Sequence, residues 1–179
     1  PWLPLHALLL GGIGSAITVW SAHFADTLLH RPALGGAVLL DIRLYAHGAG
    51  TLLVLTGITA SAQALALAGV AVVVGAALTG VLAIAVQYRR AVAPRLAALA
   101  VHYAVALVLL ATGAALGYLT SWAQARGSAH ASDVFYVAHT TTMVLGFVGT
   151  TVLGTLTVLW PTMLRTKMEP EAPRWTSRG

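Results

Sequence analysis

The sequence predicts an all-α fold, a polytopic transmembrane helix bundle with about five spans. Hydrophobic residues make up 58% of the 179 residues and charged residues only 8%, and the mean hydropathy is +0.83. A soluble domain of this length carries about three times that charged fraction. Five apolar segments each have the roughly 20 residues that a helix needs to cross about 30 Å of hydrocarbon. The composition therefore indicates an integral membrane protein whose first partner is the lipid bilayer.

Polar or turn-forming segments separate the predicted spans. The first span has neither a positively charged start nor a small-residue cleavage site, so we expect it to stay in the membrane. Pro32 and Gly35 indicate a connector before the second span. The clearest breaks are the basic segment 87–95 and the polar segment 121–133. The predicted spans are residues 3–24, 38–60, 64–86, 96–119 and 134–160.

The spans are expected to form one bundle over residues 1–164, with the amino end outside the cell and the carboxyl end inside. In this orientation Arg126 is the only one of the ten Lys and Arg residues on the outer side, as the positive-inside rule requires. Residues 165–179 then form a basic cytoplasmic tail or linker. We expect a multi-pass protein of a bacterial plasma membrane. Although the pI is near 10.3, no basic stripe follows one face, so no nucleic-acid partner is expected.

Four of the seven histidines, His6, His47, His102 and His139, fall inside predicted spans. An ionisable side chain at membrane depth costs a few kcal/mol or more, so it normally faces a cavity or the bundle interior. His6 lies near the outer end of span one, and His139 lies about 8 Å inside the outer end of span five. His102 and His47 lie about 9 Å and 14 Å above the inner ends of spans four and two. These depths predict two pairs, either as two cofactor sites or as one site and one structural pair.

The helix faces predict which of these side chains point into the bundle. His139 shares a stripe with Met143 and several small residues, and such stripes let membrane helices approach closely. We therefore expect His139 to point at protein and to face His6, with spans one and five as neighbours. His102 lies on a stripe that continues to two glycines and is also expected to point inward. The glycines beside His47 can admit either a bulky ring or a neighbouring helix.

The absence of cysteine narrows the possible cofactors. It excludes thiolate copper, cysteine-ligated iron–sulfur clusters and the attachment motif of c-type haem. Imidazole suits both haem iron and copper. A bound metal must then use imidazole, thioether, hydroxyl or carboxylate ligands, and we expect haem b or copper, with His6, His139, His47 and His102 as candidate cofactor-binding residues. The candidate metal ligands are His6, His139 and Met143.

A cofactor-free alternative stays open for each of these residues. A histidine inside a membrane protein can be a packing residue that is hydrogen-bonded to a nearby oxygen, and Met143 can simply fill the core. In that case the bundle is a membrane anchor or assembly domain, with a transporter as a third possibility. Asp41 and Arg43 are expected to form a topological anchor or an ion pair, and a proton-entry role is also open. No HExxH, GxSxG or P-loop motif is present, so hydrolytic catalysis is not expected, and whether the protein is an enzyme stays open.

Two segments carry a resemblance to known proteins. The stretch HTTTMVLGFVGTTVLGTLTVLWPTMLRTKM, residues 139–168, resembles a span in the amino-terminal membrane region of actinobacterial multicopper oxidase and copper nitrite reductase-like proteins. The stretch PLHALLLGGIGSAITVWSAHFAD, residues 4–26, resembles the first span of the same region. The histidine and glycine pattern is also similar to that of NnrS-type haem and copper membrane proteins and, more distantly, of haem-copper oxidase subunit I.

The resemblance implies an integral-membrane redox or metal module that takes part in electron transfer. It carries over His6 and His139 as the candidate ligands, whereas His47 and His102 match no motif of these families. It also implies that the chain is part of a larger oxidoreductase, in which further helices and cupredoxin domains are the partners of this bundle.

Overall fold

The computed structural model describes residues 2–91, 96–167, 169–172 and 175, and it contains helices but no strand over these residues. Five helices are long and apolar enough to cross a membrane. Each predicted span lies inside one of them to within a single residue, so the all-α fold and the five spans are confirmed. The chain is a multi-pass membrane protein. The five helices are Trp2–Leu29, Gly36–Thr59, Gln63–Arg90, Ala97–Ala125 and Ala129–Pro161.

The first and fifth spans each contain a π-helical segment, whereas the three middle spans are uninterrupted α-helices. The first span consists of α1 (Trp2–His6), η1 (Ala7–Ile13) and α2 (Gly14–Leu29). The middle spans are α3 (Gly36–Thr59), α4 (Gln63–Arg90) and α5 (Ala97–Ala125). The fifth span consists of α6 (Ala129–Thr141), η2 (Thr142–Val148) and α7 (Gly149–Met163). Since π-helical turns are frequent at functional sites, the first and fifth spans are the first places to look for one.

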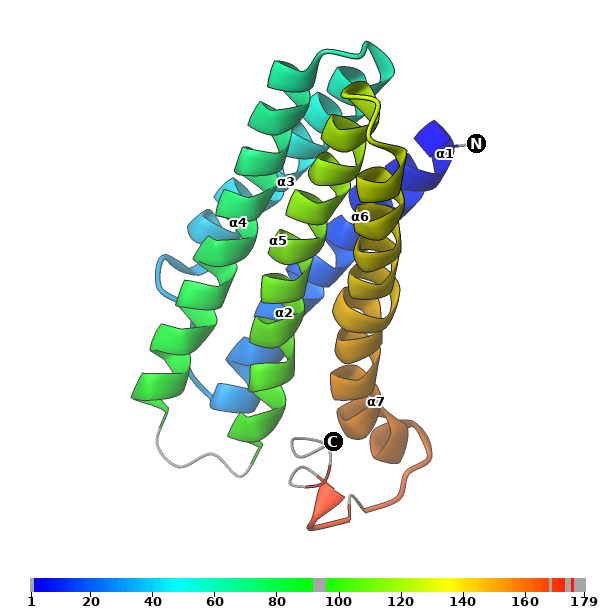
Figure 1. Cartoon of the computed structure of the whole chain (residues 1–179). Coiled ribbons are helices and arrows are strands. Elements are labelled where there is room, and N and C mark those ends of the chain that lie inside the picture. The colour runs from blue at the N-terminus through cyan, green and yellow to red at the C-terminus, as the bar shows by residue number, and fades with distance from the viewer. Residues whose placement is uncertain (1, 92–95, 168, 173–174, 176–179) are drawn as a thin grey trace.

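Spans that follow one another in the sequence pack side by side, α3 against α4, α4 against α5 and α5 against α6 (Figure 1). The α3–α4 contact is especially close, because glycines remove the side chains that would separate the two backbones. A Cβ atom on Gly69 would lie 2.6 Å from the amide nitrogen of Val54 and 2.8 Å from the carbonyl oxygen of Gly50. The first span, blue in Figure 1, crosses the other helices obliquely and packs its α2 portion against α4 and α5.

The hydrophobic core fills the half of the bundle that contains the start of α5. Tyr103 and Phe147 are the largest fully buried side chains. The Tyr103 ring stacks on Phe24 with ring centroids 5.6 Å apart and planes inclined by 7°. Its hydroxyl is hydrogen-bonded to Oγ1 of Thr155 at 3.1 Å, so the one polar atom of this aromatic ring has a partner. The other half of the bundle, which contains α1 and the end of α5, holds a cavity.

The expected ion pair between Asp41 and Arg43 is wrong. Only 4% of Arg43 is exposed, and its Nε donates to the carbonyl oxygen of Ala76 on α4 at 3.3 Å. The guanidinium occupies a notch beside Gly80, where any added side chain would collide with it. Asp41 is exposed, because residues two apart on a helix point in different directions. Within the described residues, Arg43 therefore connects α3 to α4 and does not pair with Asp41.

Candidate metal centre

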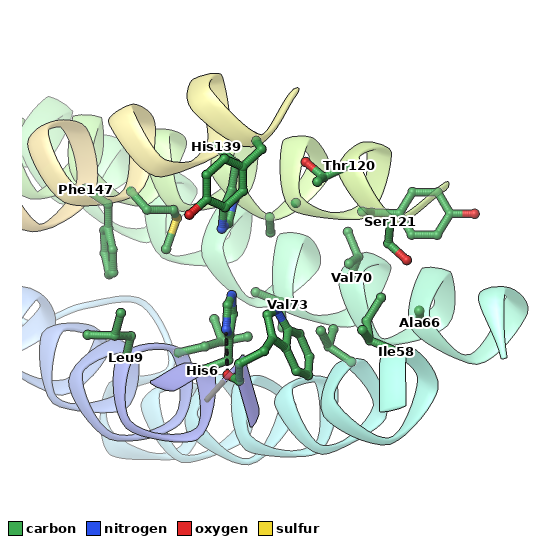
Figure 2. A pocket seen from close by; sticks show the side chains of 18 of the residues that line it. His6, Leu9, Ile58, Ala66, Val70, Val73, Thr120, Ser121, His139 and Phe147 are labelled. Carbon is green, nitrogen blue, oxygen red and sulfur yellow. Dashed lines mark hydrogen bonds between the residues drawn. The ribbon is translucent and has the colours of Figure 1, made fainter. Parts of the chain in front are cut away.

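A cavity of about 620 Å³ lies in the half of the bundle nearest the amino terminus, and all five spans contribute to its walls. Its volume falls in the range of about 300–1,000 Å³ that is typical of small-molecule sites. Figure 2 shows His6 and His139 projecting into it from opposite walls. Other lining residues lie on both sides of the line that joins the two rings, with Leu9 and Phe147 on one side and Thr120 and Ser121 on the other.

Helix α6 carries His139 into the cavity, and two glycines of α5 make room for it. Its Nδ1 lies 2.8 Å from the carbonyl oxygen of Gly113, so the Nδ1–H donates and the Nε2 lone pair is left for another partner. A Cβ atom on Gly117 would lie 3.0 Å from both Nδ1 and Cε1 of the same ring. Gly113 therefore supplies the hydrogen-bond acceptor for the imidazole, and the missing side chain of Gly117 leaves space for the ring.

His6 ends α1 and enters the same cavity from the first span. Its Nδ1 lies 3.0 Å from the carbonyl oxygen of Trp2, and its ring stacks on the Trp2 indole with centroids 4.5 Å apart. The Nδ1–H again donates to a backbone carbonyl, which leaves Nε2 with its lone pair. Metal-binding histidines almost always have this arrangement, because donation from the second ring nitrogen fixes the tautomer and the ring orientation.

The two imidazoles face each other across the cavity, as expected from their depths. Their ring centroids are 6.2 Å apart, and their planes are inclined by only 10°. In Figure 2 the ring nitrogen of His6 that does not bind Trp2 points towards His139. An imidazole–metal bond is about 2.0–2.1 Å and a ring nitrogen lies about 1.2 Å from the ring centre, so two rings on opposite sides of one metal have centroids about 6.4 Å apart. The observed separation is therefore close to that of two imidazoles bound to one metal ion.

Met143 lines the same cavity one turn after His139, and its side chain packs against Gly113. Over the described residues, no three side chains of His, Asp or Glu come close enough together to hold a metal ion. This part of the chain thus supplies two facing imidazoles and one nearby thioether. Three ligands of this kind are fewer than the four that close a typical zinc site.

The other two candidate residues, His47 and His102, are not brought together. His47 is 1% exposed, and its Nε2 lies 2.9 Å from the carbonyl oxygen of Leu10 in the first span. His102 packs against Gly154 on α7, where a Cβ atom would lie 2.9 Å from the His102 Cβ. These histidines occupy different helix interfaces, so the described part of the chain has one facing pair of imidazoles and not two.

Sequence reasoning missed the two π-helices and the contact between His47 and Leu10. Segment η1 begins directly after His6, and η2 begins three residues after His139, so each candidate ligand adjoins a π-helix. The run GGIG after Leu10 is the feature that could have indicated the contact, because glycine allows a side chain of a neighbouring helix to reach the backbone.

No protein-family model, curated protein or solved structure matches the chain. The relationship to copper oxidase-like membrane regions therefore stays a prediction. Assignment of a function rests on the cavity and the two imidazoles that face each other within it.

Proposed function

We propose that His6 and His139 are the two axial ligands of one haem b, and that the protein transfers electrons in a bacterial plasma membrane. The observation that carries this proposal is the near-parallel pair of rings with centroids 6.2 Å apart, close to the distance of about 6.4 Å expected for two imidazoles on one metal. Each ring uses Nδ1 to bind a backbone carbonyl, which leaves Nε2 as the coordinating atom.

The size of the cavity favours haem over a single copper ion. An ion displaces about as much space as one water molecule, roughly 30 Å³, whereas the cavity measures about 620 Å³. A copper ion alone would leave most of this space to lipid chains or water. A porphyrin would occupy much more of it and would also supply four further ligands to the metal.

The side chains around the cavity suit this occupant. Most of the lining is aliphatic or aromatic. Ser121 and Gln124 lie on the last turns of α5, where their hydroxyl and amide groups could donate to haem carboxylates, whereas the Thr120 hydroxyl already donates to the carbonyl oxygen of Leu116. When bound, a bis-histidine haem supplies one-electron transfer with no open position for a substrate. The low-dielectric walls of the cavity would tune the reduction potential of a bound haem.

The proposed topology determines on which side of the membrane the site lies. The amino end is placed outside because this orientation leaves only one of the ten basic residues on the outer side. The site then lies in the outer half of the bilayer. Electrons would then be exchanged with cupredoxin domains or further helices of a larger copper oxidase or nitrite reductase-like protein. That assembly is supported by the sequence resemblance alone.

A copper ion bound by His6, His139 and Met143 is a second candidate. It is favoured by the thioether that lines the same cavity and packs on Gly113, whose carbonyl oxygen holds His139. Such a site would occupy only a small part of the space. The two candidates predict different metals in the purified protein, and a cofactor-free anchor predicts neither.

The test is to purify the protein from membranes of cells that are well supplied with haem and copper. Oxidised and reduced absorption spectra, haem content and metal content are then measured for the wild type and for His6→Ala and His139→Ala. His130→Ala is the matched control, because this residue is exposed on the same helix as His139.

We expect about one haem per chain in the wild type and in His130→Ala, with a Soret band that weakens or shifts in the other two variants. Stoichiometric copper without haem would favour the second candidate. A colourless protein without either metal, or a haem spectrum that both His6→Ala and His139→Ala leave unchanged, would overturn the proposal.

A further inference from the structure

The hydrogen bonds of η1 leave one backbone carbonyl available to another helix. The N–H of Gly14 is bonded to the carbonyl oxygen of Leu9, five residues earlier. In an α-helix it would be bonded to Leu10, four residues earlier. The Leu10 carbonyl is instead bonded by Nε2 of His47 at 2.9 Å. Because His47 is 1% exposed and Leu10 is 9% exposed, this bond lies where water does not compete for it.

The two helices fit closely around this bond. A Cβ atom on Gly14 would lie 2.8 Å from Nε2 of His47, so the missing side chain is the space that the ring occupies. One turn along α3, the methyl group of Thr51 lies 3.7 Å from the position of a Cβ atom on Gly11. The contact between α3 and the first span is therefore shaped around the imidazole.

The π-helix decides in which direction His6 points. Downstream of η1, α2 is fixed in the core by Leu28 and Leu29, which are 3% and 1% exposed. A π-helix holds one more residue than the α-helical turn that it replaces. Restoring the α-helical pattern would therefore rotate everything before η1 by about 100° relative to α2 and shift it by about 1.5 Å. Such a rotation turns the His6 ring away from His139.

We propose that His47 is a positioning residue for this centre: its hydrogen bond to the Leu10 carbonyl stabilises the π-helix that points His6 at His139. The proposal rests on the proposed function, in that the benefit of this geometry is the shared haem. It assigns His47 a role outside the metal coordination sphere. Partners that orient a metal ligand in this way typically change metal affinity by about 10–100-fold when they are removed.

The test compares His47→Leu, which removes the donor, with His47→Gln, whose amide nitrogen can replace Nε2. Thr51→Val is the matched control on the same face of α3. It keeps the methyl group next to Gly11 and removes a hydroxyl that bonds within its own helix, to the carbonyl oxygen of His47 at 2.8 Å. Two quantities are measured: the spin state and retention of haem, and the amide hydrogen exchange of residues 7–14.

We expect His47→Leu to give a mixture of high-spin and low-spin haem that is released about 10–100-fold more readily. Exchange in residues 7–14 should be about tenfold faster, because a buried hydrogen bond to the backbone is lost. His47→Gln should restore most of the low-spin haem and the slow exchange, and Thr51→Val should match the wild type.

A His47→Leu protein with the spectrum and exchange of the wild type would overturn the proposal. Loss of all haem from both His47→Leu and His47→Gln, with exchange unchanged, would identify His47 as a ligand instead. If the wild type itself lacks haem, the proposed function fails, but exchange in residues 7–14 still tests the contact: faster exchange in His47→Leu alone supports it, and equal exchange refutes it.

Discussion

Replacement of Val70 by phenylalanine tests whether the cavity holds a large cofactor or a single ion. Val70 is 8% exposed and lines the cavity from α4, to one side of the two imidazoles in Figure 2. The larger ring takes space that a rigid porphyrin needs, and overpacking of this kind costs about 1–3 kcal/mol. Since each 1.4 kcal/mol is a factor of ten, haem affinity should fall by about 5- to 150-fold. A copper ion held between the imidazoles should bind as before.

The assay is titration of haem into haem-depleted protein, followed by the Soret absorbance and by the thermal stability of the complex. Ala71→Phe is the control, because its side chain is exposed on the same helix and does not line the cavity. It should bind haem as the wild type does. Equal haem affinity in Val70→Phe and Ala71→Phe would refute the assignment of this cavity as the haem site.

Three further substitutions test the geometry. Gly117→Val should displace the His139 ring, because even a Cβ atom there would lie 3.0 Å from it. We expect a lower fraction of low-spin haem in the absorption spectrum. An unchanged fraction would contradict the packing of the His139 ring against Gly117. Gly80→Ala should expel the Arg43 guanidinium from its notch and destabilise the bundle by about 1–3 kcal/mol through overpacking, seen as a lower melting temperature in detergent. An unchanged melting temperature would contradict this packing. Gln87→Ala should cost about 1–3 kcal/mol, because its amide donates to groups at the end of the first span and in the connector after it, and a melting temperature equal to that of the wild type would show that these bonds contribute little.

The spans could be predicted from sequence because a bilayer imposes one length on every crossing helix. The same constraint made the depths of His6 and His139 predictable, since each residue of a helix adds about 1.5 Å along its axis. Their facing arrangement followed from depth together with the small-residue stripe beside His139. Within the described residues, these two imidazoles lie where the sequence pattern predicted them.

The sequence pattern could not predict the π-helices, because an analysis of helix periodicity assumes 3.6 residues in every turn. One additional residue in η1 changes the direction of His6 by about 100° without changing the hydropathy of the span. The partner of His47 was only indirectly indicated, because the GGIG run after Leu10 shows that a side chain of another helix can reach the backbone there but not which one does. The pairing expected for Arg43 failed for a different reason: a nearby glycine on α4 leaves room for the guanidinium inside the bundle, and sequence spacing along α3 alone cannot show that.

Whether His6 and His139 share one metal is tested most directly by electron paramagnetic resonance of the oxidised protein purified from membranes. Two imidazole planes inclined by 10° predict a single low-spin ferric haem with a rhombic spectrum, which is lost in both His6→Ala and His139→Ala. A high-spin haem in the wild type, a copper spectrum without haem, or no metal spectrum at all would contradict bis-histidine ligation.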